Sequence, residues 1–430
     1  MHSRTLGGRR FAVRSVLAAL LLIPLLAHPA QAAAISARAD VPLMRESGYS
    51  GPNFGYAYGA SIVKATTPTG YKYYLFACTT GLASGTHDQI RLTTSTDGFT
   101  WTTPRVVVSA TGGDGSRDYS ACDPSIIYVP NPDGSQGWWY LYYTGERTTT
   151  VKCDDQVTYA HTSVVRVARS RAVDGDYVKP VTVNGVTSWV DAAATTPANN
   201  PDVMVGPHYT VCYDYGAGQQ SVTSTFDALG HQTLHMFYRD DTMKPDGTRA
   251  PEPTDHVHPV RLYSRQYHLT STDPLSWNFY GATGTSCTCS GGVQSGGDVK
   301  YDTRTGRFVD LVIPWESPDS SAPNYGLSAI SGQYSLDGNT WNSISPAVTD
   351  HSALPRFSRL EAGYSSNLFG EMTTGNTLIA FGCPVGHCES DDYGTAGVYP
   401  DEYPAGFDPN HGYWDMYGIY VANLSQTIFG

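Results

Sequence analysis

The chain has 430 residues, with 27 Lys and Arg against 39 Asp and Glu and a formal net charge of -12. Only 15% of the residues are charged and 40% are hydrophobic, a composition that excludes a disordered chain or a long coiled coil. The excess of acids disfavours a nucleic-acid partner, because binding phosphates needs clustered Lys and Arg. The high content of Gly, Pro and Tyr indicates a turn-rich protein rather than a helical one.

Residues 1–32 have the pattern of a secretory signal peptide. Four arginines precede an apolar run over 16–27, and the small-residue sequence Ala30-Gln31-Ala32 follows it. A retained membrane anchor is the alternative, but that run is shorter than the roughly 20 apolar residues a spanning helix needs. We therefore expect a secreted, extracellular monomer that consists of residues 33–430 and has no membrane partner.

Residues 33–430 contain an even number of cysteines, which favours disulfides in an exported chain. The pairing stays open among Cys78, Cys122, Cys153, Cys212, Cys287, Cys289, Cys383 and Cys388. Because no C-x-x-C pair or suitably spaced histidine set accompanies them, we expect no metal site of the zinc type.

A short motif recurs along the rest of the chain. Residues 95–101 and 335–341 both read S-x-D-G-x-T-W, with a degenerate copy at 271–277 and a looser one at 170–175. The Asp of such a motif accepts backbone N–H groups, the Gly allows a positive φ, and the Trp packs the returning strand. Asp97 and Asp337 are therefore expected to be structural turn residues.

Strand-like runs surround these turns in five groups, which predict an all-β, five-bladed β-propeller in one domain. In chain order the groups are 60–64, 71–78 and 89–94; 124–129, 138–144 and 163–169; 222–227, 233–239 and 260–269; 298–301, 308–315 and 327–334; and 364–372, 377–381 and 414–422. The fifth group lacks an outer strand, which either 41–45 or 427–429 could supply. A two-domain sandwich is the alternative, although no low-complexity linker divides the chain.

Acidic residues collect at one face of such a propeller. In an antiparallel meander the start of the first strand, the end of the second and the start of the third share one face. Asp123 and Asp298 lie at predicted first-strand starts, and Glu146, Glu316 and the pair Asp240-Asp241 follow second strands. Loops held by a rigid scaffold are the usual location of functional sites.

Three segments carry a resemblance to a known group of enzymes. The sequences DPSII at 123–127, WYLYYTG at 139–145 and VARS at 167–170 resemble the blade pattern of five-bladed propeller glycoside hydrolases, meaning family 43 and its relatives among the invertases and levansucrases. The resemblance implies a base or nucleophile in the first blade, an assisting Asp in the second and an acid in the third. Asp123 matches the second, whereas blade one opens with Tyr58-Gly59 and blade three with Ser221-Val222, so the chain would be a divergent member.

Hydrolysis of a glycosidic bond needs two carboxyl groups, one protonated and one ionised. We expect Asp123 or Asp298 to be the base or nucleophile, and Glu146 or Glu316 to be the acid, with the apolar Trp315 able to raise the pKa of its neighbour. Each of these acids has a structural alternative, as a turn cap or a solvated loop residue. Substrate contacts are expected from Tyr58, Arg239, Asp240 and Trp315.

The sequence thus predicts a secreted glycoside hydrolase that acts on a furanose- or pentose-containing polysaccharide such as arabinan, arabinogalactan or xylan. No cofactor is required, although acids in the stretch 382–413 could hold a structural Ca²⁺. The alternative is a non-catalytic propeller that binds glycans or a protein partner. A sialidase fits less well, because it needs six blades and an arginine triad.

Overall fold

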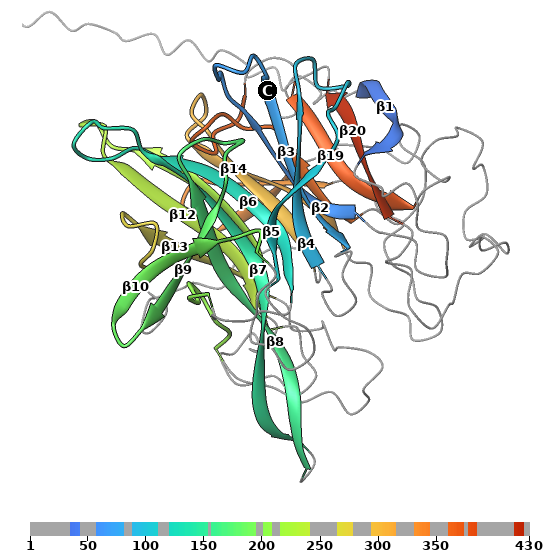
Figure 1. Ribbon diagram of the computed structural model, residues 1–430. Helices are drawn as coiled ribbons and strands as arrows, with labels where there is room; N and C mark the ends of the chain where they lie inside the picture. The colour runs from blue at the N-terminus through green and yellow to red at the C-terminus, as the bar shows by residue number, and fades with distance from the viewer. Residues whose placement is uncertain are drawn as a thin grey trace, which may run out of the picture. The chain divides into compact units, whose positions relative to one another are not determined.

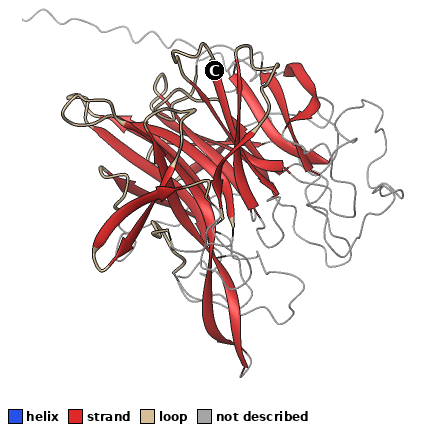
Figure 2. Cartoon of the chain, in the orientation of Figure 1, coloured by secondary structure: helices blue, strands red, loops and turns tan. Residues whose placement is uncertain are grey.

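The computed structural model describes residues 35–43, 57–80, 88–110, 120–153, 156–194, 201–208, 216–240, 265–277, 294–314, 331–344, 360–373, 377–384 and 417–424. Figure 2 shows that these residues form strands and connecting loops, with no helix among them. Within these ranges nothing resembles a membrane-spanning helix. The expected signal peptide, residues 1–32, lies outside the described part of the chain.

Five antiparallel sheets make up the fold (Figure 1). The first sheet contains β2 (Ala57–Lys64), β3 (Tyr73–Thr80), β4 (Asp88–Ser95) and β5 (Arg105–Ser109), and the second contains β6 (Ala121–Val129), β7 (Trp138–Cys153), β8 (Gln156–Ser170), β9 (Val178–Val183) and β10 (Val186–Asp191). The third contains β11 (Ala217–Phe226), β12 (Gln232–Asp240) and β13 (Arg265–Ser271). The fourth contains β14 (Gln294–Asp302), β15 (Arg307–Pro314), β16 (Ser331–Ser335) and β17 (Trp341–Ile344). The fifth contains β18 (Leu360–Tyr364), β19 (Thr377–Pro384), β20 (Tyr417–Leu424) and β1 (Ile35–Leu43).

The first strands of the sheets contact one another in a closed cycle, β2 with β6, β6 with β11, β11 with β14, β14 with β18, and β18 with β2. This is the predicted five-bladed β-propeller, and the sheets are numbered below as blades one to five from β2 onward. Radial closure buries the edges of the inner strands, which would otherwise expose unpaired backbone groups. Apolar side chains of neighbouring blades share common cores; Phe76 of blade one and Leu141 and Tyr143 of blade two, for example, belong to one buried cluster.

The outer strand of blade five comes from the N-terminal side of the described chain. β1 pairs antiparallel with β20, and Arg38 lies opposite Ala422. The first of the two predicted donors is therefore confirmed, although the strand begins at Ile35 rather than at residue 41. Residues 427–429, the other candidate, lie outside the described residues.

The repeated motif forms the predicted turn. Oδ1 of Asp97 accepts the N–H groups of Phe99 (2.8 Å) and Thr100 (2.7 Å), and Asp337 accepts the equivalent groups at the same distances. Gly98 has a φ of 89°. A Cβ on Gly98 would meet Leu378 of blade five at 2.6 Å, so the turn also packs against the preceding blade. The structural role predicted for both Asp residues is confirmed.

Two elements differ from the predicted strands. β7 and β8 pair along their whole length, from Trp139 opposite Ser170 to Cys153 opposite Gln156, so their hairpin is much longer than expected. The strand predicted over 364–372 ends at Tyr364, and the following residues instead cross the ring. Their carbonyl groups accept N–H groups from four blades: Ser366 O from Lys64 (2.7 Å), Leu368 O from Tyr128 (2.8 Å), Phe369 O from Ser224 (3.1 Å) and Gly370 O from Tyr301 (3.4 Å).

These four partners lie near the C-terminal ends of β2, β6, β11 and β14. The acids are expected at the other end of the ring, where these strands start. Residues 365–373, named here the crossing segment, therefore join all the inner strands at one end of the ring. The other end is the one that the candidate site occupies.

Candidate active site

Each first strand carries a β-bulge at the same place in its ladder. The register with the second strand shifts between Tyr58 and Ser61, Cys122 and Ser125, Gly218 and Ser221, Ser295 and Asp298, and Leu360 and Gly363. Bulges re-aim side chains and are frequent beside active sites. The five bulges therefore define equivalent positions around the ring.

Asp123 is the first residue of the bulge in blade two. It has a φ of 46°, a left-handed conformation that costs energy for residues other than Gly. The equivalent residues Gly59 and Gln219 share this conformation, with φ of 59° and 49°. Glu361 occupies the same register position in blade five, so carboxyl-bearing residues stand at this position in blades two and five.

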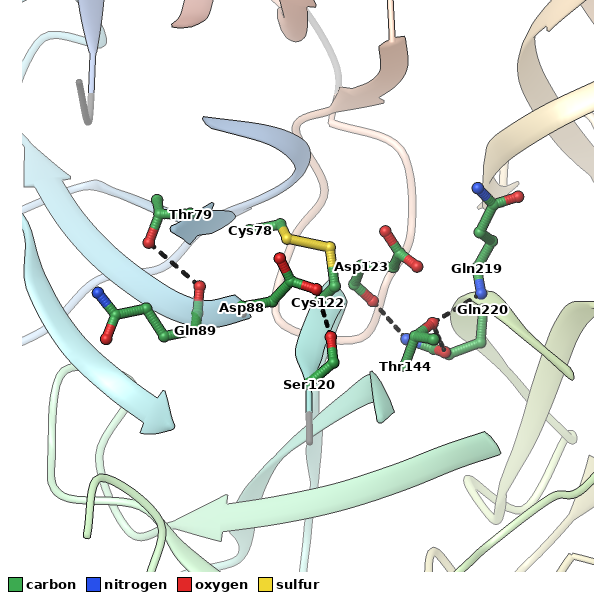
Figure 3. The surroundings of a disulfide bond; sticks show 10 residues. All are labelled: Cys78, Thr79, Asp88, Gln89, Ser120, Cys122, Asp123, Thr144, Gln219 and Gln220. Atoms are coloured by element: carbon green, nitrogen blue, oxygen red, sulfur yellow. Dashed lines mark hydrogen bonds between the residues drawn. A yellow bond between two sulfur atoms is a disulfide. The ribbon is translucent and has the colours of Figure 1, made fainter. Parts of the chain in front are cut away.

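A disulfide fixes the backbone next to Asp123. Cys122 is bonded to Cys78 at the end of β3, which ties blade one to blade two. On the other side, Nε2 of Gln220 in blade three donates to the carbonyl oxygen of Asp123. Figure 3 shows Asp123 between these two attachments. Neighbouring blades thus hold the strained residue from both sides.

Asp88, at the start of β4, lies on the other side of this disulfide (Figure 3). One of its carboxylate oxygens and both sulfur atoms lie within 4.8 Å of one another, and the hydroxyl of Ser120 donates to the carboxylate. Burial raises the pKa of Asp88 to about 7, and the charge of Asp123 adds to the rise. Asp88 was not predicted as a site residue, although the alternating strand direction of a meander places third-strand starts on this face.

Glu146, predicted as a candidate acid, belongs to the same group. Glu146 lies on β7 directly after Gly145, and Gly145 pairs with Ala121 at the start of β6. Burial raises its pKa to about 8, and the charge of Asp88 contributes. Asp88, Asp123 and Glu146, named here the acid cluster, therefore come from three strands of two blades and interact electrostatically.

Asp298 lies at the same end of the ring but at a different register position. It follows the bulge of blade four, as Ser125 and Ser221 follow the bulges of blades two and three. Ser125 Oγ accepts the N–H of Val222, and Ser221 Oγ accepts that of Val299, both at 2.9 Å. Asp298 also binds Lys300 Nζ at 2.5 Å and the hydroxyl of Ser221 at 3.0 Å. The structure therefore places Asp298 in contacts between blades.

The expected substrate-binding residues have separate surroundings. Tyr58 is half-buried opposite Cys78. Arg239 is 7% exposed, and its Nη1 donates to Gln219 Oε1 at 2.6 Å. Asp240 is fully buried and binds His208, which was not predicted as a site residue. Trp315, Glu316 and Asp241 lie outside the described residues.

Among the described residues, one group of three potential metal ligands occurs, Cys78, Asp88 and Cys122, and its two sulfur atoms are bonded to each other. The acids expected to hold Ca²⁺, from Glu389 to Asp408, lie outside the described residues.

The five-bladed propeller is also the fold of solved structures to which the chain is similar. The chain is similar to an N-acetylgalactosamine deacetylase from F. plautii, solved in complex with blood group B trisaccharide, with 14% identity, a TM-score of 0.54, and coverage of 93% of this chain and 97% of that one. It is also similar to a protein described as a glycoside hydrolase, with 10% identity, a TM-score of 0.50, and coverage of 92% and 93%. At such identities the likeness shows the fold alone. No family model and no curated protein sequence matches the chain.

Proposed function

We propose that the protein is a glycoside hydrolase whose reacting groups are Asp123 and Glu146. The observation that supports this most is the acid cluster, in which burial raises the pKa of Asp88 to about 7 and that of Glu146 to about 8. Carboxyl groups that keep a proton near neutral pH, beside a further acid, are the groups that acid–base hydrolysis needs.

In this proposal Glu146 is the general acid. It gives its proton to the glycosidic oxygen as the bond between that oxygen and the anomeric carbon breaks. In a retaining route Asp123 attacks the anomeric carbon, and the resulting glycosyl ester is then broken by a water molecule that gives its proton to the ionised Glu146. In an inverting route Asp123 takes a proton from the water that attacks the anomeric carbon. Burial keeps Glu146 protonated, and a negative charge on Asp88 adds to this effect because it disfavours ionisation of its neighbour.

The proposed substrate is a furanose- or pentose-containing polysaccharide of the arabinan, arabinogalactan or xylan type. The resemblance of residues 123–127, 139–145 and 167–170 to propeller glycoside hydrolases supports this class. The F. plautii neighbour was solved with a trisaccharide, which supports an oligosaccharide ligand on this fold. The disulfide between Cys78 and Cys122 supports export to an oxidising compartment.

The test measures reducing sugar released from purified arabinan, arabinogalactan and xylan, with acetate release from N-acetylated glycans as a second assay. We expect release from at least one polysaccharide, and a loss of at least about 100-fold in kcat for Asp123→Asn and for Glu146→Gln. Asp133→Asn is the matched control, because Asp133 is an exposed turn acid. Full activity in both cluster variants would refute the assignment of these residues.

A second candidate is a propeller that binds glycans without cleaving them. Gly59, Gln219 and Gly296, at the positions equivalent to Asp123 in blades one, three and four, carry no carboxyl group, which supports this alternative. Saturable binding of the same polysaccharides with no product release would favour it over the hydrolase.

A further inference from the structure

One buried glutamine of blade three contacts the backbone of Asp123. Gln220 on β11 is only 4% exposed, and its Nε2 donates to the carbonyl oxygen of Asp123 on β6 of blade two. Its Oε1 accepts a hydrogen bond of 3.2 Å from the hydroxyl of Thr144 on β7. Both ends of this amide are therefore bound to blade two, as the dashed lines in Figure 3 show.

The orientation of the amide follows from the chemistry of its partners. A carbonyl oxygen can only accept, so the NH₂ group of Gln220 faces Asp123 and the amide oxygen faces Thr144. The Thr144 hydroxyl donates to that oxygen and accepts the backbone N–H of Gln219 at 2.8 Å. The hydrogen bonds therefore run in one direction, from the backbone of Gln219 to that of Asp123, and bonds arranged in this way strengthen one another.

The residue that receives this chain of hydrogen bonds has a conformation that needs support. Asp123 has a φ of 46°, whereas the equivalent position in blade one is occupied by Gly59, which adopts a φ of 59° without a steric penalty. The peptide that follows Asp123 is joined to Pro124, which has no N–H. The carbonyl oxygen of Asp123 is therefore the single hydrogen-bonding group by which this peptide can be held.

The two peptides that flank Asp123 are held separately. The disulfide of Cys122 restrains the peptide before Asp123, and the Gln220 amide restrains the peptide after it. The dihedral angles φ and ψ of a residue relate the planes of its two flanking peptides. Since these angles also set the direction of the bond from Cα to Cβ relative to the strand, they determine where the carboxyl group of Asp123 points.

We infer that Gln220 is a positioning residue: through the carbonyl oxygen it holds Asp123 in the left-handed conformation and so directs the carboxyl group of Asp123 at the substrate. The inference rests on the proposed function for the role of Asp123 in hydrolysis. Thr144 supports the same role, because its hydroxyl fixes the amide oxygen of Gln220.

Kinetics on the polysaccharide that the wild type cleaves, together with a crystal structure of Gln220→Met, test the inference. Gln220→Met keeps the length of the side chain but cannot donate. We expect kcat to fall at least about tenfold while KM changes less than about twofold, because a displaced reacting group slows the chemical step without removing a substrate contact. In the crystal structure the φ of Asp123 should leave the left-handed region.

Thr144 provides a second route to the same contact. Thr144→Val removes the hydroxyl that fixes the Gln220 amide and should lower kcat, although by less than Gln220→Met. Thr144→Ser keeps a hydroxyl at this position and should retain the kcat of the wild type. A purely structural role would give no such split between the two variants at equal KM.

The matched control is Gln232→Met. Gln232 at the start of β12 also joins blade three to blade two, since its Nε2 donates to the carbonyl oxygen of Tyr128 at 3.2 Å and to Ser224 Oγ at 3.0 Å. These contacts lie at the end of the ring opposite the acid cluster, where the crossing segment binds the same strands. Gln232→Met should therefore leave kcat unchanged.

The outcomes separate this inference from the proposed function. A Gln220→Met protein that keeps the kcat of the wild type, or that keeps Asp123 in the left-handed conformation, overturns the inference even if the protein is a hydrolase. An unchanged kcat in Thr144→Val overturns it as well, so the test does not depend on the folding of one variant. If the wild type cleaves no polysaccharide, the hydrolase is rejected, and a φ of Asp123 that leaves the left-handed region in Gln220→Met still supports the hold that Gln220 exerts on Asp123.

Discussion

The backbone N–H of Tyr364 donates to Oδ2 of Asp298 over 2.9 Å and so joins blade five to blade four. At the two preceding junctions a serine hydroxyl accepts the corresponding N–H group. Asp298 differs from these serines in its charge, which the Nζ of Lys300 balances. That amine is itself buried, with only 1% of the Lys300 side chain exposed.

We predict that Asp298→Asn lowers the free energy of unfolding by about 3 kcal/mol, because removing one partner of a buried ion pair leaves the other charge uncompensated. Activity per folded molecule should change little. Urea unfolding and kcat measured on the same preparation check both statements. The double variant Asp298→Ser with Lys300→Met should regain part of the stability. A stable Asp298→Asn protein with a large loss of kcat would instead place Asp298 among the reacting acids.

The acid cluster predicts a pH dependence. Since the pKa of Glu146 is raised to about 8, Glu146 is protonated at neutral pH and loses its proton as the pH rises through that value. A general acid must be protonated, so kcat/KM should fall above about pH 8. A profile measured between pH 5 and 10 tests this, and Glu146→Gln should lack the alkaline decline.

An aryl glycoside with a good leaving group provides the control for this role. The leaving group of such a substrate departs without protonation, so Glu146→Gln should retain far more activity on the aryl glycoside than on a polysaccharide. Equal losses on both substrates would argue that Glu146 does not donate the proton.

The parts of this structure that could be predicted from sequence are those that local chemistry determines. The turn at Asp97 forms from contacts within four residues, so its motif predicts it directly. Asp123 and Glu146 could be placed at one end because a meander alternates direction with each strand. Both predictions depend on order along the chain and need no knowledge of how blades meet.

Residues defined by contacts between distant segments were missed or misplaced. Asp88 joins the cluster through its position beside a disulfide whose pairing the sequence leaves open. Asp298 was treated as equivalent to Asp123, but the bulge shifts it by two register positions. The crossing segment has the composition of a strand and leaves blade five because its carbonyl groups bind four other blades.

Gly370 of the crossing segment lies close to the backbone of blade three. Its φ is 73°, and a Cβ there would lie 2.8 Å from Thr223 Cα and 2.9 Å from Val222 O. Gly134 has a similar φ of 76° with nothing within 4 Å of such a Cβ. We predict that Gly134→Ala costs about 1 kcal/mol from backbone strain alone.

Gly370→Ala should cost roughly 2 kcal/mol more than Gly134→Ala, because backbone atoms cannot move aside as a side chain can. Urea denaturation of the two variants gives this difference. Equal losses would mean that the crossing segment is not packed against blade three as described.

Asp310 on β15 offers a test of buried charge away from the acid cluster. It is completely buried, and burial, followed by the charge of Asp298, raises its pKa to about 8. In the unfolded chain its pKa is near the usual value of about 4. Between these two values the native state holds a proton that the unfolded state has lost, so the stability contributed by Asp310 is full below about pH 4 and is lost as the pH rises to about 8.

Replacing this carboxyl with an amide should remove that dependence. We predict that the difference in free energy of unfolding, Asp310→Asn minus wild type, increases by about 1.4 kcal/mol for each unit that the pH rises between pH 5 and 8. This is the slope for one proton. Asp337→Asn is the control with opposite sign: backbone N–H groups lower the pKa of Asp337 to about 2, so its contribution is lost only as the pH falls below about 4. Urea titrations at pH 5, 6, 7 and 8 measure Asp310→Asn, and a further titration at pH 3 measures Asp337→Asn. If Asp310→Asn and the wild type keep parallel stability curves over this range, Asp310 is already ionised in the folded protein and the buried proton is disproved.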